Sequence, residues 1–285
     1  MNKKRVSIIV LAAALLILNV GQRANAQNIQ DSCTSCNTPE ILVLQSPNNL
    51  RCNDTVRVYS PKNEEPMGTL LLLHGWSGNY RDWGDKVNIQ HLADKYGFRI
   101  ITPDGFYNSW YLNNSNPAKM QAREFYNNEL LPYLIERYAL TSDNTFIDGL
   151  SMGGHGAINI FIDNHSLFRA AASMSGVLNL AYMPASIKKE LNKVIGNKVN
   201  RVAQESAIKR VEKIAGSKKT IILSCGYSDY FYPSTKEFAA LCREYKIPCI
   251  ELYGPGSHSW IFWEYALNQH LWYFRRIIEG ESLGE

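Results

Sequence analysis

Asn144-Thr-Phe-Ile-Asp-Gly-Leu-Ser-Met-Gly-Gly-His-Gly-Ala157 is the stretch around which the chain is organised. Within it, Gly149-Leu-Ser-Met-Gly153 fits the pattern G-x-S-x-G, in which a serine occupies a sharp, strained turn between a strand and a helix. The glycines are needed because side chains two residues either side of the serine would clash in that turn. Residues 145–147 are typical of a short buried strand, and a helix is expected from about Gly153 to Asn164. The pattern also occurs by chance in ordinary glycine-rich turns, so the role of Ser151 depends on partners elsewhere in the chain.

Short apolar runs alternate along the chain with segments of helical pattern. Thr69-Leu-Leu-Leu-Leu73 has the composition of a strand buried on both faces of a parallel sheet. Further strands are expected at 55–59, 98–101, 170–174, 220–224 and 249–253, and helices at 88–96, 118–138, 234–245 and 261–278. This alternation predicts an α/β fold with a mainly parallel central sheet and helices on both faces. Residues 176–217, which are richer in Lys, Asn and Ser, are interpreted as an excursion over the sheet's C-terminal edge.

Residues 1–26 have the pattern of a signal peptide. Lys3-Lys-Arg5 is a basic start, residues 6–20 form an apolar run, and Ala24-Asn-Ala26 is an A-x-A cleavage site. The apolar run is shorter than the roughly 20 residues that a membrane-spanning helix needs. No cysteine directly follows the cleavage site, so a lipid anchor is not indicated. We therefore expect a periplasmic or secreted protein, with no stable membrane insertion after cleavage.

The remaining chain is expected to form one large domain. Residues 27–54 are polar and irregular and are interpreted as an N-terminal extension, and residues 55–285 as the folded domain. The signal segment holds four of the 30 basic residues and none of the 26 acidic residues, so the mature chain has 26 of each. This balance gives no indication of a nucleic-acid partner. The sequence leaves the oligomeric state open.

All six cysteines follow the predicted cleavage site. Cys33 and Cys36 are interpreted as structural residues of the extension, because no second C-x-x-C and no histidine pair accompanies them. Cys242 and Cys249 flank a short helix-to-strand connection and could pair in an oxidising compartment, although sequence does not fix the connectivity. The chain lacks an HExxH helix and a paired Cys/His site, so we expect no metal and no cofactor.

Two later residues are candidates for activating Ser151. A serine hydroxyl is a weak nucleophile unless a positioned base takes its proton, and that base needs a third group to fix its tautomer. Asp229 follows the expected strand 220–224, and His258 follows the strand 249–253. Singly, the aspartate could be a helix cap and the histidine an ordinary loop residue. Together with Ser151, in the order Ser, Asp, His at one sheet edge, they are predicted to form a catalytic triad.

Other titratable residues fit these roles less well. His74 lies in the loop after the first central strand and is expected to shape that loop. His155 is on the helix that follows Ser151, and Asp148 should point away from the partners of the serine. The remaining histidines, His91, His165 and His270, have no motif around them.

An oxyanion formed at Ser151 would need backbone N–H donors, which commonly contribute about 3 kcal/mol each. The turn geometry supplies Met152 N–H as the first donor. Trp76 N–H, after the first central strand, is the natural second donor. The alternative interpretation of Trp76 is an aromatic lid residue.

Five motifs now follow in order over about 190 residues: His74-Gly75, Pro103-Asp-Gly105 with Asn108-Ser-Trp-Tyr111, Gly149-Leu-Ser-Met-Gly-Gly154, Cys225-Gly-x-x-Asp229 and Pro255-Gly-x-His258-x-Trp260-x-x-Trp263. This series resembles the "Putative esterase" (esterase D-like) family of α/β hydrolases. That family includes S-formylglutathione hydrolases, feruloyl and acetyl-xylan esterases, and the mycolyltransferase antigens. The resemblance implies an α/β-hydrolase fold, with Ser151 as nucleophile, Asp229 as acid and His258 as base. Trp76 and Met152 would bind the oxyanion.

The resemblance implies a serine esterase without fixing its substrate. An exported location disfavours a role on cytosolic glutathione, so a carbohydrate-linked acetyl or feruloyl ester, on a small molecule or an oligosaccharide, is the expected substrate. Trp110 and Trp260 could offer aromatic faces to it or could simply pack around the site. Three alternatives remain: an acyltransferase with the same triad, a peptidase on the same fold, and a non-catalytic binding protein.

Overall fold

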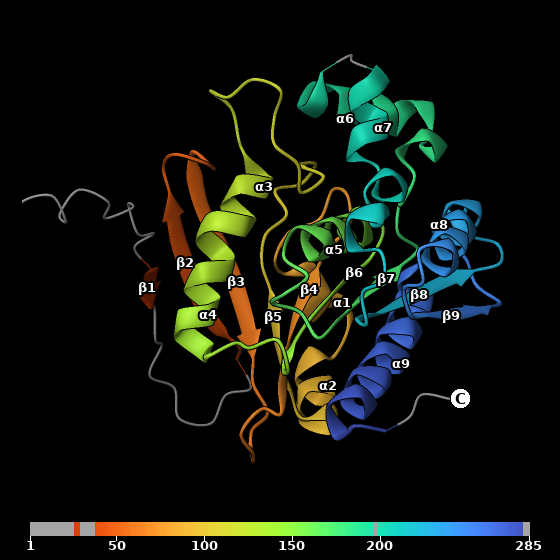
Figure 1. Ribbon diagram of the computed structural model, residues 1–285. Coiled ribbons are helices and arrows are strands. Elements are labelled where there is room, and N and C mark those ends of the chain that lie inside the picture. Colours follow the sequence, from red (N-terminus) through yellow and green to blue (C-terminus); the bar gives the residue numbers. More distant parts are fainter. Residues whose placement is uncertain (1–25, 29–37, 197–198, 282–285) are drawn as a thin grey trace, which may run out of the picture.

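The computed structural model describes residues 26–28, 38–196 and 199–281, which form a single mixed sheet with helices on both faces (Figure 1). The predicted signal peptide and the pair Cys33 and Cys36 lie outside these residues, apart from Ala26. The described strands follow the order β1-β2-β3-β5-β4-β6-β7-β8-β9. Their bounds are β1 Ala26–Asn28, β2 Glu40–Ser46, β3 Cys52–Tyr59, β4 Gly68–Leu73, β5 Phe98–Thr102, β6 Thr145–Gly149, β7 Ala170–Met174, β8 Thr220–Gly226 and β9 Cys249–Gly254.

Strands β4 to β9 pair in parallel, whereas β1, β2 and β3 are joined to them by antiparallel pairings. Parallel strands place all their carboxyl ends at one edge of the sheet, and the loops that leave this edge carry the candidate site. The predicted α/β fold with a mainly parallel sheet is confirmed.

Two hydrophobic cores cover the two faces of the sheet. Successive residues of β4 alternate between them: Leu70 and Leu72 belong to one core, and Leu71 and Leu73 to the other. The first core includes residues of α1 Asp82–Lys86, α2 Ile89–Tyr96 and α9 Trp260–Glu279. The second includes residues of α3 Ala122–Phe125, α4 Leu131–Tyr138, α5 Met152–Asp163 and α8 Tyr232–Glu244. The sheet is therefore buried on both sides, as its apolar strands require.

The N-terminal extension differs from the prediction of irregular chain. Glu40–Ser46 forms β2, which pairs along its whole length with β3. Leu42 and Leu44 alternate inward to the core, a period of two that lies between Pro39 and Pro47. The prolines and asparagines around Glu40–Ser46 suggested a loop, although they lie at the two ends of a strand. The expectation is therefore wrong from Glu40 onward, because this part belongs to the sheet.

The helix predicted at 118–138 is also different. It begins at Ala122, and a π-helical segment, Tyr126–Leu130, separates α3 from α4. Pro132 follows the π-helical segment within one continuous helical run, where its missing N–H cannot donate to the preceding turn. The irregularity therefore precedes the proline.

The segment between β7 and β8 carries the predicted excursion. It contains α6 Ala185–Ile195, α7 Val199–Glu205 and the 3₁₀ turns η2 Leu180–Tyr182, η3 Ala207–Lys209 and η4 Val211–Ile214. Figure 1 shows α6 and α7 beyond the end of the central strands. Throughout the described ranges, no helix combines the length and apolar character needed to cross a membrane.

Candidate active site

Ser151 lies in a strained turn between β6 and α5. Its backbone has φ 53° and ψ −116°, a conformation that costs a residue with a side chain of order 1–3 kcal/mol. The turn is tight because α5 starts against β4. A Cβ on Gly153 would lie 2.4 Å from the carbonyl oxygen of Leu73. Only glycine fits there, which is the physical reason for the second glycine of the motif.

The structure brings Ser151, His258 and Asp229 together at the carboxyl edge of the sheet. Asp229 follows β8, and His258 lies in the loop between β9 and α9. Ser151 Oγ lies 3.0 Å from His258 Nε2, and His258 Nδ1 lies 3.0 Å from Asp229 Oδ2. In the tautomer that satisfies both contacts, Nδ1–H donates to the carboxylate and Nε2 accepts the serine proton. This hydrogen-bonded chain is the geometry that a serine nucleophile requires.

Asp229 is buried and held as a carboxylate. Burial alone would raise the pKa of Asp229, but the hydrogen bond and charge of His258 outweigh it. The N–H of Phe231 donates to Asp229 over 2.8 Å, and the hydroxyl of Ser175 adds a further hydrogen bond. Together these donors bring the pKa of Asp229 below its ordinary value of 3.8. The carboxylate thus stays charged and can orient the histidine at neutral pH.

Trp263 supports the same group from α9. Its Nε1–H donates to Ser175 Oγ over 3.1 Å, and its ring meets the His258 ring edge-on with centroids 4.9 Å apart. Trp263 therefore restrains both the histidine and the serine that holds Asp229. The sequence motif contained this tryptophan, but its position alone did not assign the role.

The loop after β4 lies against the turn that carries Ser151. A Cβ on Gly75 would be 3.5 Å from the Cβ of Ser151. The N–H of Trp76 has no acceptor among the described residues. Met152 is the first residue of α5, so its N–H has no partner within the helix. Both predicted donors therefore adjoin the serine with free N–H groups.

His74 fixes the shape of this loop, as the sequence suggested. Its Nε2 accepts from the N–H of Gly105 over 2.6 Å, and its Nδ1 lies 2.8 Å from the carbonyl oxygen of Gly75. The side chain is 1% exposed, so it cannot reach a substrate. It joins the loop that carries Trp76 to the loop after β5.

A pocket of about 470 Å³ opens beside Ser151 and His258. Its walls include both tryptophans predicted to meet substrate, Trp110 and Trp260. Trp110 is only 2% exposed and forms part of the wall. Residues that the prediction missed also line the pocket: Val177, Pro184, Ile187, Tyr230 and Phe231. Tyr230 and Phe231 directly follow Asp229, and this position next to a predicted catalytic residue could have identified them as pocket residues.

A second Ser-His-Asp arrangement lies buried beneath the first. His270 Nδ1 is 2.7 Å from Asp148 Oδ2, and His270 Nε2 is 2.6 Å from Ser224 Oγ. All three side chains are at most 1% exposed, so no substrate reaches them. Asp148 lies on β6, Ser224 on β8 and His270 on α9. β6 leads to Ser151, β8 leads to Asp229, and α9 follows His258. The buried trio therefore links the three elements that adjoin the catalytic residues.

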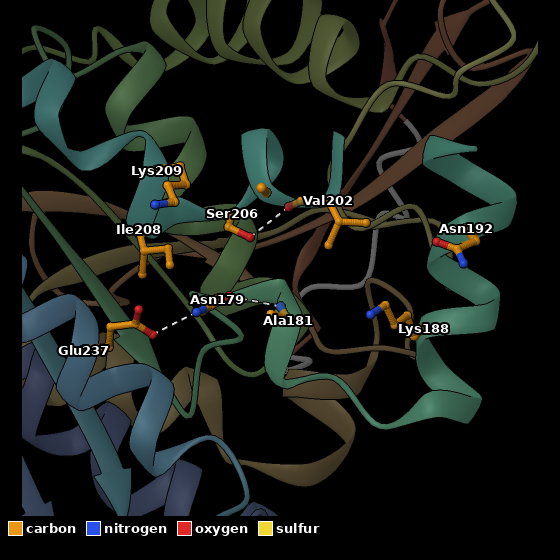
Figure 2. A pocket seen from close by; sticks show the side chains of 10 residues that line it. Asn179, Ala181, Lys188, Asn192, Val202, Ser206, Ile208, Lys209 and Glu237 are labelled. Atoms are coloured by element: carbon orange, nitrogen blue, oxygen red, sulfur yellow. Dashed lines mark hydrogen bonds between the residues drawn. The ribbon is translucent and has the colours of Figure 1, made fainter. Parts of the chain in front are cut away.

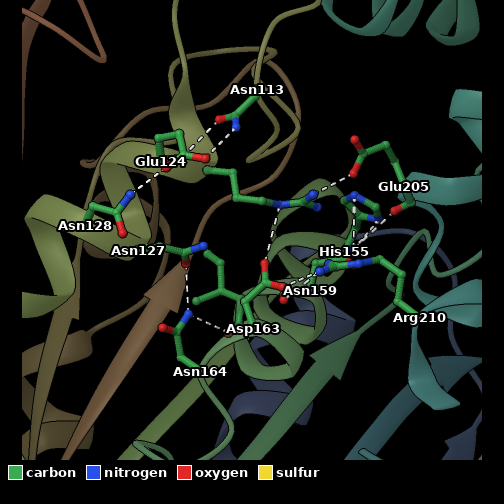
Figure 3. Close-up of polar contacts among 12 residues, drawn as sticks. Asn113, Glu124, Asn127, Asn128, His155, Asn159, Asp163, Asn164, Glu205 and Arg210 are labelled. Carbon is green, nitrogen blue, oxygen red and sulfur yellow. Dashed lines mark hydrogen bonds and ion pairs between the residues drawn. The ribbon is translucent and has the colours of Figure 1, made fainter. Parts of the chain in front are cut away.

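His155 lies one helical turn after Ser151 and is fully buried. Burial, followed by the charges of Arg123 and Arg210, lowers the pKa of His155 to about 3. Asn159 Nδ2 lies 3.2 Å from His155 Nδ1 and donates to the neutral ring. Figure 3 shows this network spreading from α5 toward Glu205 and Arg210.

The arginines of the network are themselves paired. Arg123 forms an ion pair with Glu205 at 2.6 Å, and Arg210 pairs with Asp163. These pairs join α5 and α3 to the segment between β7 and β8. The network could not be predicted from the sequence, because its members are far apart along the chain.

The sheet order and the strained serine turn define an α/β-hydrolase fold. Residues 47–274 match the sequence model of the family described as "Putative esterase". The chain therefore belongs to this esterase family, and it is a serine hydrolase that acts on carboxylic esters.

Curated relatives agree with this assignment. An acetyl esterase from Caldicellulosiruptor saccharolyticus is 28% identical over 229 residues, which cover 74% of this chain and 84% of the relative. The S-formylglutathione hydrolase of Rattus norvegicus is 25% identical, with 78% of this chain and 88% of the relative covered. Among solved structures, a ferulic acid esterase superposes with a TM-score of 0.69 at 21% identity, over 90% of this chain and all of the other. That structural likeness shows the shared fold.

Proposed function

We propose that this protein is an exported carboxylesterase that removes acetyl or feruloyl-type groups from carbohydrates, with Ser151, His258 and Asp229 as its catalytic triad. One observation carries the proposal. The continuous hydrogen-bonded chain from Asp229 through His258 to Ser151 ends at the wall of a pocket that can hold an ester.

In the first step, Ser151 Oγ bonds to the ester carbonyl carbon while His258 Nε2 takes the hydroxyl proton. The carbonyl electron pair moves onto the oxygen. The N–H groups of Met152 and Trp76 stabilise this oxyanion. Collapse of the tetrahedral intermediate breaks the bond to the alcohol oxygen, and the alcohol leaves with the proton from His258.

In the second step, water attacks the acyl-serine. His258 takes a proton from the water as its oxygen bonds to the acyl carbon, and a second tetrahedral oxyanion forms. When this intermediate collapses, the carboxylic acid is released and Ser151 regains its proton from His258. Asp229 stays charged throughout and stabilises the imidazolium that forms in each step.

The acyl preference rests on the pocket and on the curated relatives. The aromatic rings of Trp260, Tyr230 and Phe231 give the pocket apolar walls beside Ser151. Such walls favour a small or aromatic acyl group over a charged one. The similarity to an acetyl esterase supports the smaller group.

Export rests on the basic, apolar and A-x-A segments of residues 1–26. Fractionation of producing cells, with mass spectrometry of the purified chain, tests it. We expect an extracytoplasmic protein that begins at Gln27. An intact chain retained in the cytoplasm contradicts this part of the proposal.

The enzymatic part is tested by hydrolysis of p-nitrophenyl acetate, p-nitrophenyl butyrate and methyl ferulate by the mature protein and its Ser151→Ala variant. We expect activity on at least one ester and a loss of several orders of magnitude in the variant. Activity that survives in Ser151→Ala means that another group is the nucleophile. A folded wild-type protein that is inactive on all three esters contradicts the proposed acyl preference.

A further inference from the structure

A second hollow, of about 420 Å³, lies in the segment between β7 and β8 (Figure 2). We call it the α6 groove. Lys188 and Asn192 of α6 form one wall, and Ile208 and Glu237 lie on the opposite side. Val202 also lines the groove, and Asn179 lies beside Glu237. None of these six residues belongs to the triad or its supports.

The α6 groove and the catalytic pocket share the same two stretches of chain. Val177 lines the catalytic pocket, and Asn179 lines the groove. Likewise Ile187 faces the pocket, and its neighbour Lys188 faces the groove. The two hollows therefore lie on either side of these short segments. A molecule with its ester bond at Ser151 would therefore have to cross α6 to reach the groove.

The polar groups of the groove are divided between donors and an acceptor. The side chains of Lys188 and Asn192 are half-buried and make no hydrogen bond or ion pair with another described residue. Across the groove, Glu237 accepts from Asn179 Nδ2 over 2.8 Å, which fixes the carboxylate in place. The side-chain oxygen of Asn179 is occupied too, since this Oδ1 accepts from the N–H of Ala181. Lys209, an exposed residue on the side of Ile208, also lines the groove, so the groove presents ammonium or amide donors on both sides and one anchored acceptor.

This combination matches the hydroxyl-rich ring of a sugar. Each hydroxyl both accepts and donates, so one ring can accept from Asn192 and donate to Glu237. The apolar side chains of Val202 and Ile208 suit the C–H face of a pyranose. An aliphatic chain would leave the Lys188 ammonium in the groove without a polar partner.

We propose that the α6 groove binds the saccharide part of the substrate, as pyranose units attached to the alcohol side of the ester. This inference rests on the proposed function, because it assigns the leaving group of the same reaction. The groove then selects among acylated saccharides, while the catalytic pocket selects the acyl group.

The test compares two substrates in Lys188→Ala, Asn192→Ala and the double variant. Acetylated xylo-oligosaccharides fill both hollows, whereas p-nitrophenyl acetate fills only the catalytic pocket. Each lost hydrogen bond should raise KM for the oligosaccharide about three- to tenfold, since such bonds contribute about 0.5–1.5 kcal/mol. KM and kcat for p-nitrophenyl acetate should stay within twofold of wild type. Lys189→Ala, on the exposed neighbour of Lys188, is the matched control.

Binding without turnover separates the two proposals. Ser151→Ala is titrated calorimetrically with deacetylated xylo-, manno- and gluco-oligosaccharides, alone and combined with the two α6 substitutions. We expect one of these saccharides to bind and the α6 substitutions to weaken it at least tenfold. If none binds, or if both ester substrates lose activity in parallel, the groove is not a saccharide site, even where esterase activity stands. If wild type hydrolyses no ester but a saccharide still binds in the groove, the proposed reaction fails and the site remains.

Discussion

Buried His155 should make folding stability depend on pH. Its pKa is about 3 in the folded chain, against 6.5 for an exposed histidine. Between these two values the unfolded chain binds a proton at this residue and the folded chain does not. The free energy of unfolding therefore falls as pH falls from 6.5 toward 3.

The size of the effect follows from the two values. Below pH 6.5, His155 should lower the free energy of unfolding by about 1.4 kcal/mol per pH unit. The free energy of unfolding should therefore be about 2 kcal/mol lower at pH 5 than at pH 7.5 because of this residue. For a chain of this size, about 2–4 °C of melting temperature corresponds to each kcal/mol. His155 alone should therefore lower the melting temperature by about 4–8 °C over this range.

The assay is denaturant or thermal unfolding of wild type and His155→Gln at half-unit steps from pH 5 to 7.5. Glutamine keeps a neutral polar group near Asn159 but takes up no proton. We expect His155→Gln to be less stable than wild type at pH 7.5. Between pH 7.5 and pH 5, its free energy of unfolding should fall by about 2 kcal/mol less than that of wild type. His165→Gln, at an exposed histidine, is the control and should follow wild type. If the curves of wild type and His155→Gln are parallel within about 0.5 kcal/mol, the argument from the buried neutral imidazole fails.

Three further predictions concern the site and its supports. Asp229→Asn should lower kcat on p-nitrophenyl acetate by roughly 10⁴-fold with little change in melting temperature, because the histidine loses its orienting charge; a loss below tenfold argues against the triad. His270→Phe leaves the Asp148 carboxylate buried without its partner and should destabilise the fold by about 3–5 kcal/mol in thermal unfolding; a melting temperature equal to wild type would show that the trio adds no stability. Gly153→Ala forces a Cβ against the Leu73 carbonyl oxygen and should cost about 1–3 kcal/mol together with most activity; Gly254→Ala, where a Cβ meets nothing within 4 Å, should be tolerated.

The sequence predicted the central fold because each inner strand is short, apolar and bounded by turn residues. It also predicted that Ser151, Asp229 and His258 would meet, since parallel strands bring their carboxyl ends to one edge. That inference needed only chain order and strand position, both of which are local properties of the sequence.

The parts that could not be predicted depend on contacts between distant residues. Asp148 and His270 are 122 positions apart, and nothing near either residue indicates the other. The sequence of β2 does alternate between apolar and other residues. However, Pro39 and Pro47 on either side of it are typical of turns, and the segment was therefore predicted as irregular.

The segment that contains α6 and α7 starts after β7 and ends before β8. These two strands are neighbours in the sheet and pair in parallel, from Ala170 with Thr220 to Met174 with Ser224. The three residues of the proposed catalytic triad, Ser151, His258 and Asp229, all lie outside residues 179–217. This segment supplies Pro184 and Ile187 to the wall of the catalytic pocket, and Lys188, Asn192 and Ile208 to the α6 groove. A change of sequence within it therefore alters the walls of both hollows, whereas the strands that lead to the triad residues stay paired beneath it.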